Sequence, residues 1–194
     1  MLKKRIAQYI EEQKAAQPKV TLFEPERGYA LENGLISEGE VLSPESPRFE
    51  EAFIERCDKE TEEPIRTETA SFLDQPVTYL NEHKNEFVFL ESVWFTVIGA
   101  DAVSIEVDDV FGTYDAMLGL KLQKKHRKEI ELFLEDTLQD ESSYDLLFNG
   151  EDGLWDLNFT LNDHPGFNEG LSMHAVYELI FDFLFKLLQT VEEA

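Results

Sequence analysis

The sequence contains a single cysteine, Cys57, so no disulfide can form within the chain. Disulfide-stapled folds are thereby excluded, and this cysteine usage is typical of a reducing compartment. Charged residues interrupt every apolar stretch before it reaches the ~18 residues of a membrane span. The first residues also lack the apolar core of a secretory signal, because Glu11 and Glu12 follow too soon. We therefore expect a cytoplasmic protein with no membrane partner.

Positive charge is scarce. The chain has 17 Lys and Arg against 41 Asp and Glu, a net charge of −24. Such a surface repels nucleic acid, because binding a polyanion relies on Lys and Arg displacing counterions from phosphates. Anionic membrane surfaces are disfavoured for the same reason. The charge leaves solubility, metal ions or a cationic protein partner as its explanations.

Aromatic residues, by contrast, are plentiful. The chain has 15 Phe, 6 Tyr and 2 Trp, and 42% of its residues are hydrophobic. Disordered chains lack this content, so we expect a folded protein with a sizeable core. At 194 residues the chain fits one domain. Within it, residues 1–46 form a helix plus a loop-rich segment, and residues 47–194 form the main body.

Apolar residues at helical spacing predict most of the helices. Residues 18–47 are instead punctuated by proline and glycine, which predicts a long loop with at most one turn near Gly28. The last helix begins at Ser172, a good N-cap, and is apolar on nearly all sides. It is therefore buried on its own sheet or in a homodimer. The predicted helices span residues 2–15, 47–63, 67–72, 74–83, 122–138 and 172–191.

Residues rich in β-formers, or alternating between apolar and polar, predict the strands. The clearest hairpin surrounds the turn at residues 149–153. A second hairpin is expected across residues 99–101, joining an apolar stretch at 93–98 to the alternating residues 103–107. The fold class is then α+β, an antiparallel sheet of four or five strands packed with helices. The ranges with strand character are residues 87–90, 93–98, 103–107, 115–120, 144–148 and 154–161.

One acidic stretch could carry chemistry. Glu106 and Asp108 share the polar face of a predicted strand, and Asp109 and Asp115 lie close by in sequence. Carboxylates are the hard oxygen ligands that Mg²⁺ and Ca²⁺ require. The stretch does not match an EF-hand loop, and so acidic a chain produces clusters by chance. A metal site and a solvated strand end both remain open.

Other motifs of catalysis are missing. The four histidines have no zinc-helix spacing, and neither G-x-S-x-G nor the phosphate-binding G-x-x-x-x-G-K-[ST] occurs. We expect His83, His126, His164 and His174, like Cys57, to be structural. One basic run either pairs with nearby carboxylates or marks a self-association patch. It comprises Lys121, Lys124, Lys125, Arg127 and Lys128.

Four runs, at residues 47–62, 106–115, 118–125 and 147–159, resemble a group of short acidic bacterial proteins. Members of that group often carry the automatic label "branched-chain amino acid aminotransferase". The label implies pyridoxal phosphate held as a Schiff base on a lysine. The candidate lysines here lie in polar helical contexts, and no phosphate cup is visible at a helix start. The resemblance assigns no catalytic residue, and no cofactor is predicted.

These patterns favour a non-enzymatic interaction or regulatory protein. A metal-dependent enzyme using the carboxylates near Asp108, and an aminotransferase, are the alternatives. The charge is also unevenly placed, since residues 140–194 contain 12 acidic residues and one basic residue, Lys186. A basic helix precedes that region. We therefore expect charge-complementary packing, either within the fold or between two copies.

Overall fold

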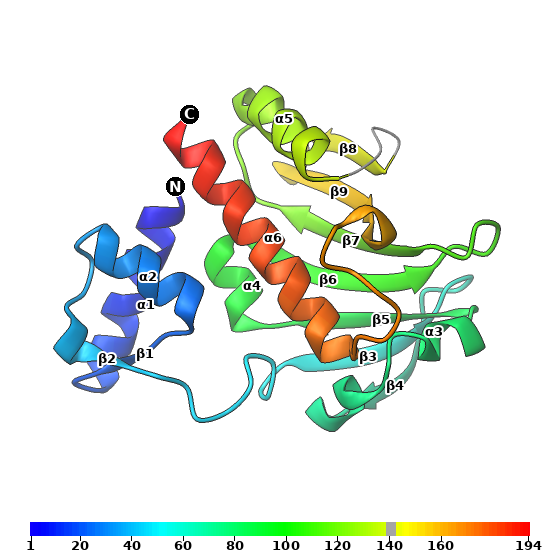
Figure 1. Cartoon of the computed structure of the whole chain (residues 1–194), viewed down its shortest axis with the longest axis horizontal. Coiled ribbons are helices and arrows are strands. Elements are labelled where there is room, and N and C mark those ends of the chain that lie inside the picture. The colour runs from blue at the N-terminus through cyan, green and yellow to red at the C-terminus, as the bar shows by residue number, and fades with distance from the viewer. Residues whose placement is uncertain (139–142) are drawn as a thin grey trace.

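A seven-stranded antiparallel sheet forms the centre of the structure (Figure 1). The computed structural model describes residues 1–138 and 143–194. The strands lie in the order β4-β3-β5-β6-β7-β9-β8. Their bounds are β3 Phe53–Asp58, β4 Pro64–Glu68, β5 Glu86–Glu91, β6 Ala100–Val107, β7 Tyr114–Leu120, β8 Tyr144–Asn149 and β9 Leu154–Thr160. The α+β class is confirmed, but the sheet is larger than the four or five strands expected.

Strands β3 and β4 account for the difference. Strand β3 occupies residues predicted to be helical, and β4 covers the interval after that predicted helix and the first two residues of the helix predicted at 67–72. Apolar residues at 49, 53, 54 and 57 suggested helical spacing, yet Ile54 faces one side of β3 while Phe53 and Cys57 face the other. Asp58 closes the hairpin, because its carboxylate accepts from the backbone N–H groups of Glu60 and Thr61. Pairing with β5 overrides the local preference for helix.

The converse error occurs at α4 (Val93–Ile98), which was predicted as a strand. Ser92 caps this helix by accepting from the Trp94 N–H, and Gly99 ends it with a φ of 82°. Gly99 is therefore a helix end and not a hairpin turn. A side chain here would also collide with Arg5, whose guanidinium donates to the carbonyls of Ile98 (2.7 Å) and Lys121 (2.6 Å).

The N-terminal segment is more ordered than the predicted loop. Helix α1 (Leu2–Ala16) matches the prediction, and a second helix, α2 (Glu24–Glu32), follows with Pro25 in its first turn. Gly28, near which the glycine and proline pattern predicted a turn, lies inside α2. Strand β1 (Val20–Thr21) pairs in parallel with β2 (Val41–Leu42), and a 3-10 turn at Glu38–Glu40 precedes β2.

Most of the remaining elements follow the predictions with shifted bounds, but the helix predicted at 67–72 is replaced by the end of β4 and a 3-10 turn, and the one predicted at 74–83 is reduced to residues 79–82. The helix expected at 122–138 begins as the 3-10 turn Lys124–His126 and continues as α5 (Arg127–Thr137). Short 3-10 turns at Ala70–Asp74 and Leu161–Asp163, and helix α3 (Tyr79–Glu82), connect the strands. The last helix, α6 (Met173–Glu193), begins at Ser172, whose hydroxyl accepts from the Ala175 N–H (3.2 Å).

Helices cover one face of the sheet. Helix α6 crosses that face diagonally, and α5 and α4 pack beside it (Figure 1). Eleven α6 side chains are buried, and Tyr177 donates its hydroxyl to the Val88 carbonyl of β5 (2.8 Å). The apolar character of α6 is thus accounted for within the chain, and a homodimer through it stays a prediction. No helix in the described ranges is both long and apolar enough to span a membrane.

Candidate functional site

The face of the sheet that points away from α6 carries a distinctive set of side chains, which we name the open face. The strand register aligns them in three rows. The first is Thr67, Glu55, Phe89, Ser104, Met117, Asn158 and Asp145; the second is Phe53, Glu91, Ala102, Gly119, Asp156 and Leu147; the third is Cys57, Phe87, Glu106, Asp115 and Thr160. These positions include six carboxylates and neither lysine nor arginine.

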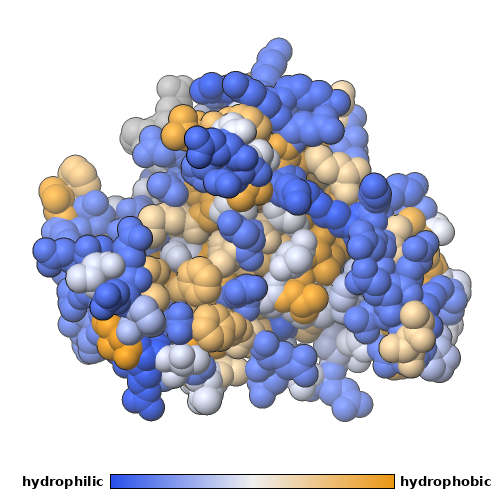
Figure 2. Space-filling model, turned by 180° about the vertical axis from the view of Figure 1, so that it is seen from behind, coloured by the Kyte–Doolittle hydropathy of each residue, from blue (hydrophilic) through white to orange (hydrophobic). Residues whose placement is uncertain are grey.

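Apolar side chains on the open face remain partly accessible. Phe53 is 45% exposed and Leu147 is 69% exposed, while Phe89 and Met117 are half-buried. In Figure 2 apolar residues gather over the middle of this face and hydrophilic residues surround them. A contiguous apolar area bordered by polar residues is typical of a protein interaction site.

The carboxylates of the open face have few cationic partners. Only Glu106 forms an ion pair with a lysine or arginine in the described part of the chain, with Lys59 at 3.5 Å. Glu91, Asp145 and Asp156 are exposed and unpaired there. Burial raises the pKa of Glu106 and of Asp115, although Lys59 and a hydrogen bond from Thr160 (2.9 Å) oppose this. The face is therefore negative and electrostatically unsatisfied.

A groove of about 830 Å³ runs between α1 and one border of the open face. Phe89, Val97 and Ala102 contribute its apolar walls, and the cations Arg5 and Lys121 line it together with acidic residues. Asp101 is held in place because its carboxylate accepts from the N–H groups of Ala102 (2.7 Å) and Gly119 (2.8 Å). A side chain at position 119 would collide with that carboxylate, which explains the glycine. The acidic residues lining the groove are Glu12, Glu91, Asp101 and Asp152.

The four carboxylates considered as metal ligands do not converge on one point. Glu106 and Asp115 are cross-strand neighbours, but the Lys59 ammonium lies between Glu106 and Asp109, 3.6 Å from the latter. Asp108 instead accepts from the backbone N–H groups of its own turn, which lowers its pKa. Within residues 1–138 and 143–194, no group of three or more His, Cys, Asp or Glu could hold a metal ion.

The histidines and the cysteine lie apart from one another. His83 stacks on Tyr79 with ring centroids 4.0 Å apart, and His164 accepts from the Gly166 N–H (3.1 Å). The Nε2 atom of His174 is buried with no hydrogen-bond partner among the described residues. Cys57 is 5% exposed, and burial raises the pKa of its thiol. Among the residues that the structure describes, none of these groups has the partners that a nucleophile or general base requires.

The basic run near residue 121 is mostly unpaired. Arg127 pairs with Glu131 at 2.7 Å, whereas Lys121, Lys125 and Lys128 have no carboxylate partner within the described ranges. All of these side chains are exposed. No lysine in the described chain is buried, so none occupies the enclosed position typical of a Schiff-base lysine.

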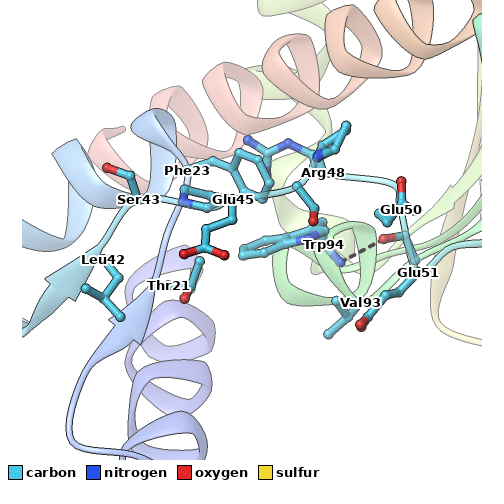
Figure 3. Close-up of a pocket in the computed structure, with 14 residues that line it drawn as sticks. Thr21, Phe23, Leu42, Ser43, Glu45, Arg48, Glu50, Glu51, Val93 and Trp94 are labelled. Carbon is cyan, nitrogen blue, oxygen red and sulfur yellow. Dashed lines mark hydrogen bonds between the residues drawn. The ribbon is translucent and has the colours of Figure 1, made fainter.

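Sequence reasoning missed a buried ion pair beside a second pocket. Arg48, expected near a helix start, turns inward and donates to Glu26 and to Glu178 (3.1 Å). Its guanidinium lies over the rings of Phe181 (3.8 Å) and Phe23 (4.2 Å). The adjoining pocket, about 570 Å³, is shown in Figure 3. Because Arg48 is already satisfied by two carboxylates, it joins the N-terminal segment to α6 and offers no charge to a ligand.

No family model, curated protein sequence or solved structure matches this chain. What the protein binds is therefore inferred from its own residues.

Proposed function

We propose that the protein is a non-enzymatic binding protein whose open face receives a basic partner protein. One observation carries this proposal: helices cover a single face of the sheet, and the other face combines accessible apolar side chains with unpaired carboxylates. A face meant only for water would carry polar residues in place of Phe53, Phe89 and Leu147. The apolar residues supply the contact area, and the carboxylates select the partner.

The arrangement matches the anatomy of protein interfaces. Their centres are apolar and aromatic, and their rims are polar. A stable interface needs roughly 800 Å² on each partner, which is the scale of a seven-stranded sheet face. The groove beside α1 extends the face with a concave border, lined by four acidic residues and by Arg5 and Lys121. A partner with protruding apolar side chains and flanking Lys or Arg would therefore be complementary to the site.

Electrostatics favours a basic partner over a neutral one. The net charge of −24 attracts cationic proteins over a distance, and the unpaired carboxylates then gain partners on contact. No lysine or arginine belongs to the three rows, and within the described residues none forms an ion pair with Glu91, Asp145 or Asp156. Binding should consequently be fast and should weaken as salt is added.

Neutralising the rim tests the proposal. The triple variant Glu91→Gln, Asp145→Asn, Asp156→Asn removes three exposed charges from the open face without altering side-chain volume. As probe we choose a synthetic peptide alternating Lys and Phe, measured by calorimetry at low and at physiological salt. We expect an affinity loss of about 10-fold or more, because each pair that is lost contributes up to ~1 kcal/mol.

The matched control removes three exposed carboxylates elsewhere. Glu11, Glu32 and Glu193 lie on α1, α2 and α6, and each is exposed. Their replacement by Gln leaves the same net charge as the first variant and should change the affinity about 2-fold or less, through screened long-range attraction alone. Equal losses in the two variants, or binding of a Glu–Phe peptide as tight as that of the Lys–Phe peptide, would refute a specific basic-partner site.

A further inference from the structure

The loop between β6 and β7 presents the two most exposed large apolar residues of the described chain. Val110 is 82% exposed and Phe111 is 81% exposed. They stand side by side at the tip of the hairpin, where Asp108 and Asp109 flank them. We name these four residues, 108–111, the hairpin knob. An apolar pair displayed this fully is unusual in so acidic a chain and indicates a contact.

Hydrogen bonds within its own turn define the backbone of the hairpin knob. Asp108 accepts from the N–H groups of Val110 (2.8 Å) and Phe111 (2.6 Å), and its own N–H donates to the Thr113 carbonyl (2.8 Å). Gly112 follows with a φ of 70°, which closes the turn. A preformed loop loses little conformational entropy on binding, so its two apolar side chains can act as anchors.

A basic pocket lies at the other end of β7. Its volume is about 530 Å³, and Leu122 and Phe148 provide apolar wall. Arg5, Lys121 and Lys125 supply its positive charge, His126 also lines it, and no Asp or Glu does. We name it the basic pocket. Eight of the 17 Lys and Arg residues fall in the two segments that meet here, at residues 3–5 and 121–128.

The hairpin knob and the basic pocket are complementary in two ways. The knob offers two apolar side chains beside two carboxylates, and the pocket offers apolar walls beside three cationic side chains. We infer that the hairpin knob of one molecule inserts into the basic pocket of a second copy of this chain. The aspartates then meet the lysines while Phe111 meets Leu122 and Phe148.

The contact must be between molecules. The hairpin knob precedes Tyr114, the first residue of β7, and the basic pocket begins after Leu120, its last residue. Seven residues of strand separate the two by roughly 23 Å at about 3.3 Å per residue. Since two different surfaces meet, the contact is head-to-tail and generates a ring or an open chain of copies instead of a two-fold dimer.

Salt should reveal how the contact forms. At low ionic strength the overall charge of −24 keeps two copies apart. Near 0.15 M salt the screening length is about 8 Å. Repulsion between distant charges of the two copies is then screened, while the attraction within close Asp–Lys pairs persists. Self-association should therefore be strongest at intermediate salt and should weaken again when high salt screens the pairs themselves.

Complementation between two variants tests the inference. Phe111→Ser disables the knob and keeps the pocket, whereas the double variant Lys121→Glu, Lys125→Glu disables the pocket and keeps the knob. All three side chains are exposed, so the fold should be retained, which circular dichroism checks. In sedimentation at about 0.15 M salt, the unaltered protein should self-associate and each variant alone should do so at least 10-fold more weakly. Mixing the variants should restore one contact and give a one-to-one heterodimer.

Matched controls are available in the same chain. Leu132→Ser removes an apolar side chain that is 53% exposed on α5, and Lys19→Glu with Lys84→Glu reverses two exposed charges elsewhere. Both should self-associate like the unaltered protein. A monomeric unaltered protein at all salt concentrations, or mixed variants that stay monomeric, would overturn the inference. None of Glu91, Asp145 and Asp156 lines the basic pocket, so the three-carboxylate variant of the open face should leave self-association unchanged.

Discussion

The two faces of the central sheet come from the same strands and yet differ in almost every physical respect. Toward α6, alternate residues such as Val103, Ile105 and Leu157 are at most 1% exposed and pack against helices. On the open face, their neighbours Ser104, Glu106 and Asn158 alternate with accessible Phe and Met. The side chains of the covered face stabilise the fold by packing against the helices. Those of the open face are not needed for this packing, so their composition can serve another role.

The difference also governs how charge is handled. On the helix-covered side the buried guanidinium of Arg48 is held by two carboxylates and two aromatic rings. On the open face five of the six carboxylates form no ion pair with a lysine or arginine within the described residues. A buried charge needs a partner of opposite charge within the molecule, because burial removes it from water. An exposed charge is solvated and needs no such partner.

The largest effect on stability should come from removing Arg48 from its buried ion pair with Glu26. Arg48→Met removes the guanidinium and leaves Glu26, which is fully buried, without its cation. Burial already raises the pKa of Glu26, and Arg48 opposes that shift. We expect a loss of about 3–5 kcal/mol in the free energy of unfolding, measured by urea denaturation at neutral pH.

A second substitution, at Glu26, distinguishes the loss of the ion pair from the loss of the packing that Arg48 provides. In the double variant Arg48→Met, Glu26→Gln the buried group is neutral, so a large part of the stability should return. A double variant as unstable as Arg48→Met alone would show that stacking on Phe23 and Phe181 accounts for the loss.

Truncating the same residue type on each face compares the faces directly. Leu157 of β9 is fully buried on the covered face, and Leu147 of β8 is 69% exposed on the open face. Leu157→Ala should cost about 2–5 kcal/mol of unfolding free energy, because it leaves a cavity. Leu147→Ala should change it by about 0.5 kcal/mol or less. Comparable losses would mean that the open face contributes to the core.

The smallest effect should come from Asp115, whose carboxylate is half-buried on the open face. Burial raises its pKa, so its ionised form destabilises the folded state above that pKa, and the penalty disappears below the unfolded value of about 3.9. Asp115→Asn keeps an acceptor for Thr160 and should stabilise by roughly 0.5 kcal/mol or less at neutral pH. The gain should vanish as pH falls, and a gain unchanged at acid pH would contradict this account.

Much of the fold could be predicted wherever the local sequence pattern agrees with the secondary structure that tertiary contacts stabilise. The hairpin at 144–161 and the helix after Ser172 follow from alternation and from a cap. Sequence reasoning failed where two signals conflict. Residues 93–98 are β-branched and aromatic, yet Ser92 and Gly99 cap them into a helix. Residues 53–58 have helical spacing, yet β5 provides a pairing partner that no local pattern reveals.

The candidate site was only partly foreseeable. Glu106 and Asp115 were noticed as acidic residues near each other, and the structure makes them cross-strand neighbours. Their membership in a whole acidic and apolar face depends on the order of seven strands, which a single sequence does not specify. Arg48 and Glu26 were missed for a related reason, since long-range folding alone buries two charges 22 residues apart.

The contact between Arg5 and Gly99 has a consequence for how the chain tolerates change. Arg5 holds α1 to the sheet by donating to two main-chain carbonyls, so substitutions at positions 98 and 121 leave its acceptors in place. Position 99 is different, because any side chain there would occupy the space of the guanidinium. In a library of random variants, therefore, residues 5 and 99 should depend on each other, although 94 positions separate them in the chain.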